Sequence, residues 1–176
     1  MVQQAFKSII EPIIEADFQD FGYGYRPHRS AKQASDETRK YLNFGLTNVI
    51  DIDIMRFFDH IDHEKMIFFV IRRIADPYIL KLIREWLKAG AVHGSGVTYP
   101  GMGTPQGGII SPLLANIYLN ELDTLWVKKR MNDPLGQNEQ IIRYADDMVI
   151  LTDREPENAM AMLKRTISLL GLQLDM

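Results

Sequence analysis

The chain has 176 residues, of which 24% are charged and 46% hydrophobic, and it contains no cysteine. That length suits one domain, or a compact two-lobed one, with a buried core. Twenty Lys and Arg against 23 Asp and Glu give a net charge of −3, which argues against a polybasic binder of nucleic acid or membrane. Without cysteine there is no disulfide, thiolate metal site or cysteine nucleophile, and four histidines make a histidine-built zinc site a poor expectation. With no long apolar run and no signal-peptide pattern, we expect a soluble intracellular protein whose chemistry rests on carboxylates.

Proline and glycine divide the start of the chain. Helical spacing of apolar residues predicts a helix over residues 3–18, which Pro12 is expected to break into two pieces. Residues 21–27, Phe-Gly-Tyr-Gly-Tyr-Arg-Pro, cannot form a regular helix. Ser30 and Gln33 then form a capping box, which predicts a helix to about residue 42.

Residues 47–55 alternate as a strand does. Ile50, Ile52 and Ile54 fall on one face, and Asp51 and Asp53 fall on the other. The remaining elements, in chain order, are predicted as a helix over 62–74, a helix over 76–90, a hairpin around the turn at 94–96, a glycine-rich loop over 100–108, a helix over 111–131, a hairpin of strands 139–144 and 148–152, and a helix from 156 that stops at 171. This mixture predicts an α+β fold, with helices packed on one face of a mainly antiparallel sheet.

Three aspartates need an explanation. Asp146 and Asp147 lie in the turn of the second hairpin, and the ordinary interpretation of such a pair is turn chemistry. Asp53 lies 93 positions earlier inside an apolar strand, where a carboxylate needs a partner or a cation. If the two segments are neighbours in the sheet, three carboxylates meet and raise each other's pKa.

Divalent cations would remove that repulsion. Hard oxygen ligands of this kind favour magnesium or manganese. Two such ions about 3.5–4 Å apart can activate a 3′-hydroxyl and stabilise a leaving pyrophosphate.

Four blocks in the chain, taken in order, resemble one family. They are Gly-Tyr-Arg-Pro-His-Arg-Ser at 24–30, Asp-Ile-Met-Arg-Phe-Phe-Asp at 53–59, the fourteen residues 103–116 that begin Gly-Thr-Pro-Gln-Gly-Gly, and Tyr-Ala-Asp-Asp at 144–147. Together they resemble the reverse transcriptases encoded by bacterial group II introns, also called intron maturases. The resemblance implies a polymerase palm-like fold, with a partial helical fingers region over residues 1–46 and the palm over 47–176. The thumb, maturase and endonuclease domains of the family are expected to be absent.

By resemblance, Asp53, Asp146 and Asp147 are the catalytic aspartates, and the carbonyl of Ile54 helps to hold a metal. The implied cofactor is a pair of Mg²⁺ ions, with Mn²⁺ as a possible substitute. Phe58 matches a steric gate that favours deoxynucleotides. The resemblance also implies substrate-binding positions, which are Phe57, Gln106, Gly107, Tyr144 and Ala145. The plain alternatives are a core phenylalanine, a surface glutamine and a flexible glycine-rich connector.

Arg26 and Arg29 stand beside tyrosines and could contact template phosphates, although structural packing explains them equally well. Asp51 shares the face of Asp53 and is a candidate for supporting it. The implied partners are an RNA template (group II intron RNA), a DNA primer and deoxynucleoside triphosphates, with no membrane and an open oligomeric state. The expected location is the bacterial cytoplasm.

The resemblance therefore implies an RNA-directed DNA polymerase, poorly active as this chain alone because most phosphate-binding Lys and Arg of the family would lie elsewhere. A second hypothesis is an RNA-binding splicing module whose polymerase site is unused. A third, an RNA-templated RNA polymerase or a nucleotide cyclase, is disfavoured by Phe58 and the block around Gln106.

Overall fold

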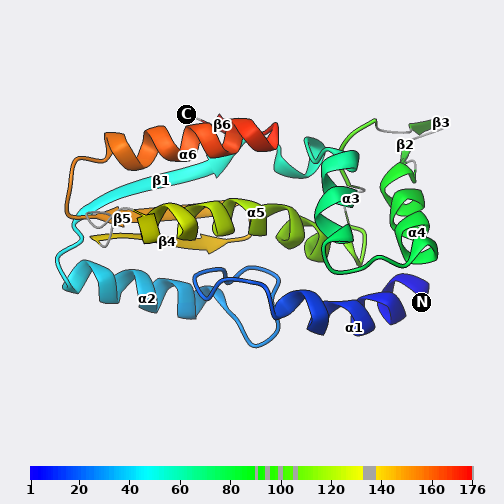
Figure 1. Ribbon diagram of the computed structural model, residues 1–176, viewed down its shortest axis with the longest axis horizontal. Helices are drawn as coiled ribbons and strands as arrows, with labels where there is room; N and C mark the ends of the chain where they lie inside the picture. The colour runs from blue at the N-terminus through cyan, green and yellow to red at the C-terminus, as the bar shows by residue number, and fades with distance from the viewer. Residues whose placement is uncertain (90, 94–95, 99–100, 105–106, 133–137, 176) are drawn as a thin grey trace. The chain divides into compact units, whose positions relative to one another are not determined.

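The computed structural model describes residues 1–89, 91–93, 96–98, 101–104, 107–132 and 138–175 (Figure 1). These residues form two compact units. The first comprises residues 1–17 and 56–118, and the second comprises residues 18–55 and 119–176. One long helix, α5 (Ser111–Asn132), contributes to both.

An antiparallel sheet organises the second unit. Its strand order is β4 (Glu139–Tyr144), β5 (Asp147–Thr152), β1 (Asn48–Ile54) and β6 (Leu174–Asp175). The pairs β4·β5, β5·β1 and β1·β6 are all antiparallel. The predicted α+β class and antiparallel sheet are therefore confirmed, while the two-residue strand β6 has too short a pattern to be read from the sequence.

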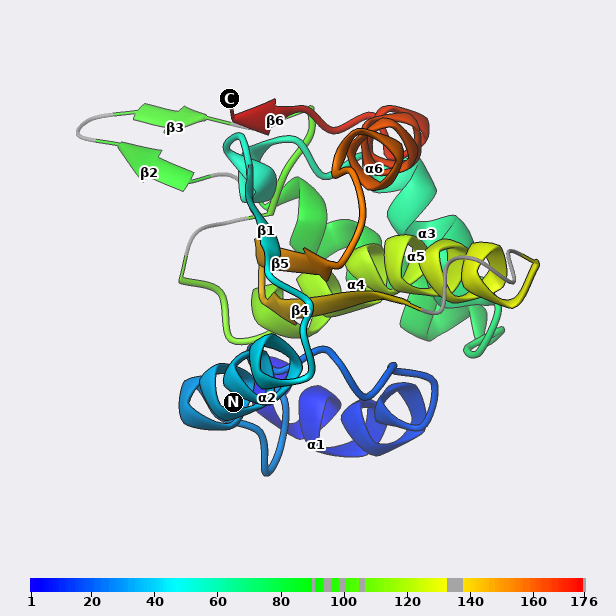
Figure 2. The ribbon, with the colours of Figure 1, turned by 90° about the vertical axis from the view of Figure 1, so that its left-hand side faces the viewer.

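Helices cover the sheet of the second unit. Helix α6 (Glu157–Leu170) and the second part of α5 lie on one face of the strands (Figures 1 and 2). Helix α2 (Ala31–Asn43) packs against β4 and β5 through a buried cluster on the other face. That cluster contains Tyr23, Ala34, Leu46, Ile142 and Leu151. Near β1, the same face stays open, since Val49, Asp51 and Asp53 are exposed.

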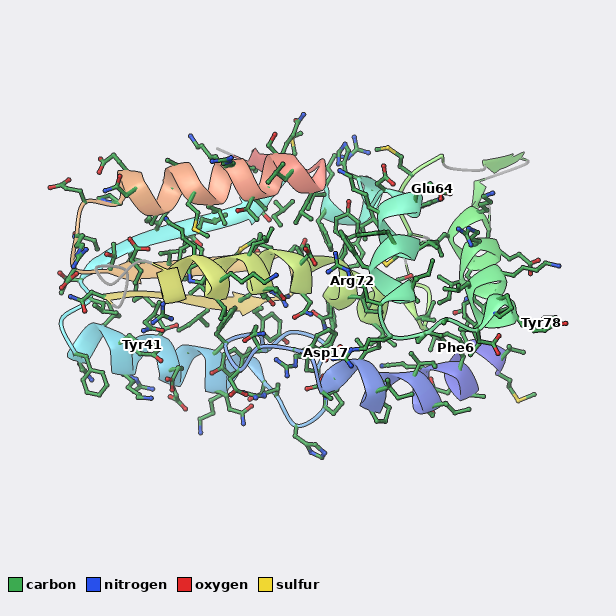
Figure 3. The ribbon with its side chains drawn as sticks, viewed as in Figure 1. Phe6, Asp17, Tyr41, Glu64, Arg72 and Tyr78 are labelled. Atoms are coloured by element: carbon green, nitrogen blue, oxygen red, sulfur yellow. The ribbon has the colours of Figure 1, made fainter. Side chains whose placement is uncertain are left out.

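The first unit is mainly helical. It contains α1 (Val2–Glu15), the short 3₁₀ helix η1 (Phe57–Asp59), α3 (His63–Ile71), α4 (Pro77–Lys88) and the hairpin β2 (Ala91–His93) with β3 (Gly96–Thr98). Phe6 lies on α1 (Figure 3). Its ring meets the Trp86 ring of α4 edge-on, with centroids 5.0 Å apart. Arg73, just after α3, holds Asp17, just after α1, with two nitrogens. These contacts join α1 to α3 and α4.

Pro12 does not break the first helix, so that prediction was wrong. Helix α1 is continuous over 14 residues with Pro12 inside it. A proline removes one backbone donor and crowds the carbonyl four residues earlier, but Pro12 is exposed, so water can satisfy the Ser8 carbonyl. The buried residues Ile10 and Ile14 hold the helix to its neighbours on the opposite side.

Side chains cap helices α2, α3 and α4, and the cap at Ser30 is the one predicted from the sequence. The Ser30 hydroxyl accepts the Gln33 backbone N–H at 3.3 Å, and the Asp62 carboxylate accepts that of Lys65 at 2.9 Å. Asp76 caps α4, and Gly171 ends α6 with φ 79°. Helices α3 and α4 end two to three residues before the predicted 74 and 90. Across the described residues, no helix combines the length and apolar character needed to cross a bilayer.

Candidate active site

Asp146 lies in the two-residue turn that joins β4 to β5. The ladder closes with Tyr144 paired to Asp147, which leaves Ala145 and Asp146 as the turn. Ala145 has φ 59°, a conformation that suits tight hairpins and that an alanine adopts only when its surroundings impose it. The strand β5 therefore begins at Asp147, one residue earlier than predicted, and this aspartate points to one face of the sheet at its very end.

Strand β1 brings Asp53 to the same end of the sheet. In the β1·β5 register, Ile52 pairs with Met148 and Asp51 pairs with Val149. Continuing this register by one residue sets Asp53 opposite Asp147. Because β1 alternates, Asp51 and Asp53 face the open side while Ile52 and Ile54 are buried. The expected convergence of residues far apart in sequence is thus carried by strand pairing.

The charges of the neighbouring carboxylates interact, as the pKa values of Asp146 and Asp147 show. The pKa of Asp146 is raised from its ordinary value of 3.8, first by burial and then by the charges of Asp147 and Asp53, while Arg143 acts in the opposite direction. Burial also raises the pKa of Asp147, as do the charges of Asp53 and Asp51. Asp51 is therefore part of the same negative cluster. On the other edge of β1, Asp175 pairs with Asp53 in the ladder with β6.

This donor set fits a hard divalent cation in its chemistry. Burial first, and then the charges of neighbouring carboxylates, raise the pKa of Asp146 and Asp147 at this end of the sheet, and a bound cation would relieve the charge repulsion. Within the part of the chain that the structure describes, no three His, Asp or Glu side chains close around a common point as a finished metal site does. Strand pairing therefore brings the backbone positions of these aspartates to one end of the sheet, while their side-chain oxygens do not surround a common point.

Gly24 packs directly against the backbone of the turn. A β-carbon added to Gly24 would lie 2.2 Å from the Ala145 backbone nitrogen and 2.9 Å from its α-carbon. The preceding residues of that segment pair with β4, since the Tyr23 N–H donates to the Arg143 carbonyl at 2.8 Å and the Arg143 N–H donates to the Phe21 carbonyl at 2.9 Å. The irregular stretch of aromatic residues and glycines is therefore an additional edge of the sheet that backs the turn.

A buried ion pair also lies under the turn. Arg143 and Asp123 are 1% and 0% exposed in their side chains, and the Arg143 Nη2 lies 2.6 Å from an Asp123 oxygen. Sequence reasoning missed both residues, although each is a charge within an apolar stretch. Asp123 follows Leu122 on a core helix, and Arg143 follows Ile141 and Ile142 in a strand.

The two arginines predicted to bind nucleic acid have partners inside the protein. Arg26 is buried, stacks over the Phe18 ring at 5.3 Å and donates to the carbonyls of Gln19 and Gly22. Arg29 donates to the Asp20 carboxylate at 2.7 Å and lies over the Tyr23 ring. Both therefore shape the segment that backs the turn, and their contact with nucleic acid stays a prediction.

The substrate-binding residues predicted from the resemblance are divided between the two units. Ile54, Tyr144 and Ala145 belong to the second unit, with the aspartates. Phe57, Phe58 and Gly107 belong to the first unit, and Gln106 lies outside the described residues. Gly107 has φ 81° and open space around it, so its conformation favours glycine.

Phe57 and Phe58 differ in burial. Phe57 is 1% exposed and packs edge-on against Phe58 and Tyr118, with ring centroids 5.3 and 6.3 Å apart. Phe58 is only partly buried. Its backbone carbonyl accepts the Thr104 N–H at 2.9 Å, and a β-carbon on Gly103 would approach that carbonyl to 2.8 Å. The loop before Pro105 therefore fixes the backbone of Phe58.

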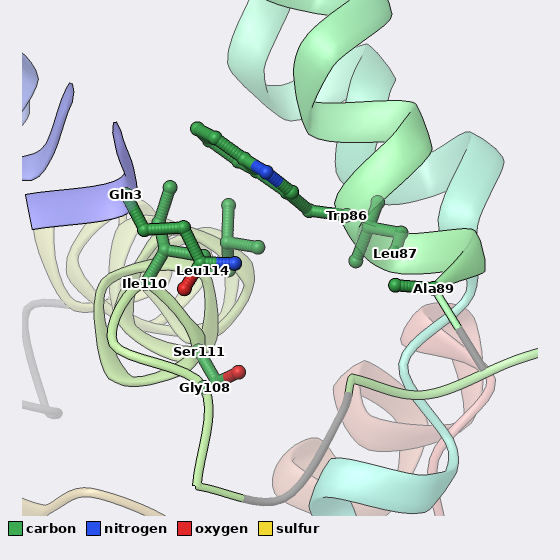
Figure 4. Close-up of a pocket in the computed structure, with 8 residues that line it drawn as sticks. All are labelled: Gln3, Trp86, Leu87, Ala89, Gly108, Ile110, Ser111 and Leu114. Atoms are coloured by element: carbon green, nitrogen blue, oxygen red, sulfur yellow. The ribbon is translucent and has the colours of Figure 1, made fainter. Parts of the chain in front are cut away.

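A small cavity of about 120 Å³ lies elsewhere in the first unit (Figure 4). Residues of α1, α4 and the start of α5 line it, among them Trp86 and Leu114. None of the predicted catalytic aspartates borders this cavity.

Comparison with known proteins gives a consistent result. The family model described as reverse transcriptase (RNA-dependent DNA polymerase) matches residues 1–176. The group II intron-encoded protein LtrA of Lactococcus lactis subsp. cremoris is 39% identical over 141 residues, which cover 80% of this chain and 23% of that protein. Protein YkfC of Escherichia coli (strain K12) is 39% identical over 127 residues, covering 70% of this chain and 33% of that protein. The chain thus spans a third or less of the length of these relatives.

Solved structures share the fold. Telomerase from Candida tropicalis, in complex with the TWJ fragment of telomeric RNA, superposes with a TM-score of 0.70 at 12% identity. The match covers 96% of this chain and 32% of the telomerase chain.

Proposed function

Because this chain belongs to the reverse transcriptase (RNA-dependent DNA polymerase) family, we propose that it carries the site at which deoxynucleotides are joined to a primer 3′-hydroxyl on an RNA template. The observation that carries the proposal is the strand pairing that gathers Asp53, Asp146 and Asp147 at one end of an open sheet face. Nucleotidyl transfer asks the protein mainly for position and for charge stabilisation, which such a cluster supplies through bound cations.

The cofactor of this proposal is Mg²⁺, two ions with Mn²⁺ as a possible substitute. Asp53, Asp146 and Asp147 would hold them, with the backbone carbonyl of Ile54. When bound, they would activate the primer hydroxyl and neutralise the leaving pyrophosphate. The chain itself contributes the hairpin that presents two carboxylates next to each other, the neighbouring strand that presents the third, and a repulsion between these carboxylates that a bound cation would relieve.

The proposed partners are an RNA template, a DNA primer and deoxynucleoside triphosphates. The similar telomerase is described as bound to an RNA fragment. A group II intron RNA is the proposed template because LtrA is described as encoded by such an intron. We also place the protein in the cytoplasm of a bacterium, on the strength of the relatives from Lactococcus and Escherichia.

The net charge of −3 means that Asp and Glu outnumber Lys and Arg, so the chain has no surplus of positive charge to hold phosphates. We therefore propose that these 176 residues alone extend primers poorly, and that the full-length polypeptide containing them is the proper subject of an activity test.

Primer extension on an RNA template with Mg²⁺ tests the proposal. The full-length polypeptide should extend a DNA primer with deoxynucleotides, and Asp146→Ala should reduce the rate by at least about a thousandfold, since it removes a proposed metal ligand. Asp153→Ala is the matched control, because Asp153 is an exposed aspartate beyond the end of the same strand. Unaltered extension by Asp146→Ala would remove the catalytic role from this hairpin.

A further inference from the structure

One guanidinium in the second unit bridges a helix and the catalytic turn. The Arg143 Nε lies 3.0 Å from Asp123 Oδ1, and its Nη2 lies 2.6 Å from Oδ2, so the fork of the arginine grips the carboxylate of α5. The remaining terminal nitrogen, Nη1, donates to the Ala145 carbonyl at 3.0 Å. Ala145 is the turn residue immediately before Asp146. A single side chain therefore connects the core helix to the backbone that presents two proposed metal ligands.

Stability alone does not account for this arrangement. Burying both members of an ion pair costs several kcal/mol of desolvation for each ion, and apolar replacements of similar volume are often neutral or stabilising. A buried pair is better explained where it specifies a conformation. Here the conformation is that of the turn, in which Ala145 has φ 59°. Neighbouring residues must impose this unfavourable backbone angle.

The backbone of Arg143 is also fixed by hydrogen bonds. Its N–H and carbonyl both bond to the segment of Phe21 and Tyr23, and Gly24 of that segment packs against the turn. The arginine thus has a fixed backbone, a fixed guanidinium and a direct bond to the turn. We propose that Arg143 and Asp123 are positioning residues of the polymerase site: Asp123 orients the Arg143 guanidinium, which anchors the Ala145 carbonyl and so sets the direction in which Asp146 and Asp147 leave the hairpin.

This inference rests on the proposed function, since it gives the pair a role in presenting the metal ligands. The proposed positioning role requires an arginine at residue 143. A lysine at 143 keeps the positive charge and can pair with Asp123, but its single nitrogen lacks the planar fork that serves the carboxylate and the carbonyl together. Arg143→Lys therefore separates the anchor from the charge.

The test compares two properties of the full-length polypeptide carrying Arg143→Lys. Amide hydrogen exchange of residues 144–147 should increase at least about tenfold, because the turn opens more readily. The kcat of primer extension should fall at least about tenfold, while the affinity for primer and template stays unchanged. Arg73→Lys is the matched control, since Arg73 also grips an aspartate with two nitrogens but lies in the first unit. It should leave the turn exchange and kcat unchanged.

A second variant guards against simple loss of folding. Asp123→Glu combined with Arg143→Lys restores the combined length of the pair without restoring the fork. This double variant should have the urea unfolding midpoint of the wild type. It should keep the fast amide exchange of residues 144–147 and the low kcat of Arg143→Lys. Recovery of kcat together with stability would overturn the positioning role, as would wild-type exchange and kcat in Arg143→Lys. If the wild-type polypeptide extends no primer, the proposed function fails, and the exchange measurement still decides whether the anchor exists.

Discussion

Gly24 lies so close to Ala145 that a β-carbon on the glycine would stand 2.2 Å from the alanine backbone nitrogen. No real β-carbon contact is that short, and the obstructing atoms are backbone rather than a flexible side chain. The identity of residue 24 is therefore tied to the shape of a turn 121 positions later. This relationship explains why the segment before α2 matters to a site at the end of the sheet.

We predict that Gly24→Ala destabilises the protein and impairs extension. Forcing a methyl group into this contact should cost about 1–3 kcal/mol of unfolding free energy. The turn must shift to admit it, so the rate of primer extension should fall by more than the stability loss explains. Urea denaturation and single-turnover extension measure the two effects. Gly101→Ala is the control: nothing lies within 4 Å of its β-carbon, so its stability should change by about 0.5 kcal/mol or less. Equal behaviour of the two variants would refute the packing argument.

The raised pKa values of Asp146 and Asp147 predict a pH dependence of stability. An acid whose pKa is higher in the fold than in the unfolded chain contributes its full stability below the ordinary value of 3.8, and that contribution is lost as the pH rises through the raised pKa. At pH 7 and without metal, removing one charge should therefore stabilise the protein. We expect Asp146→Asn to raise the Tm by a few degrees at pH 7 and by less near pH 4. Thermal melts in EDTA across this range measure it, and a lower Tm at pH 7 would contradict it.

Magnesium should stabilise the wild type more than a variant that lacks a proposed metal ligand. Binding to the folded state stabilises it by RT ln(1 + [Mg²⁺]/Kd), about 1.4 kcal/mol at ten times the Kd. Adding Mg²⁺ at constant ionic strength should raise the Tm of the wild type and raise that of Asp53→Asn much less, because the variant loses a proposed ligand. Asp153→Asn should keep the full shift. An Asp53→Asn shift equal to that of the wild type would remove Asp53 from the metal site.

The sequence predicted the parts of the site that have a local signature. Alternation in residues 47–55 placed Asp53 and Asp51 on one face, and the apolar strands around Asp146 and Asp147 predicted the hairpin. The Arg143–Asp123 pair has no such signature, since its members lie 20 positions apart on a strand and a helix and meet only when α5 covers the sheet. The role of Gly24 is likewise set by an approach of two distant backbones.

In helix α1 a local sequence signal gave a wrong prediction, because packing of the helix outweighed it. Pro12 argued for a break, yet burial of Ile10 and Ile14 outweighs the missing hydrogen bond. We predict that Pro12→Ala stabilises the protein by about 1–2 kcal/mol, because the new N–H can donate to the Ser8 carbonyl, less the entropy that proline removes from the unfolded chain. Urea denaturation measures the change, and primer extension should be unaffected. A loss of stability would mean that the proline shape itself is needed in α1.

Phe58 is the residue proposed to discriminate between sugars, and its surroundings suit that role. A steric gate works only if the ring cannot move aside. The Phe58 ring leans on Phe57, which is itself packed against Tyr118, and the Thr104 N–H holds the Phe58 backbone carbonyl. The partly exposed ring therefore stands on a rigid support.

We predict that Phe58→Ala lowers the preference for deoxynucleotides over ribonucleotides at least about tenfold, because the space that a ribose 2′-hydroxyl needs is opened. Single-nucleotide extension with each triphosphate, compared as kcat/KM, gives this ratio. Phe68→Ala is the control, since Phe68 is a largely exposed phenylalanine on α3, and its ratio should match that of the wild type. If Phe58→Ala lowers both rates in proportion and leaves the ratio unchanged, the ring only supports the fold and the sugar is selected elsewhere.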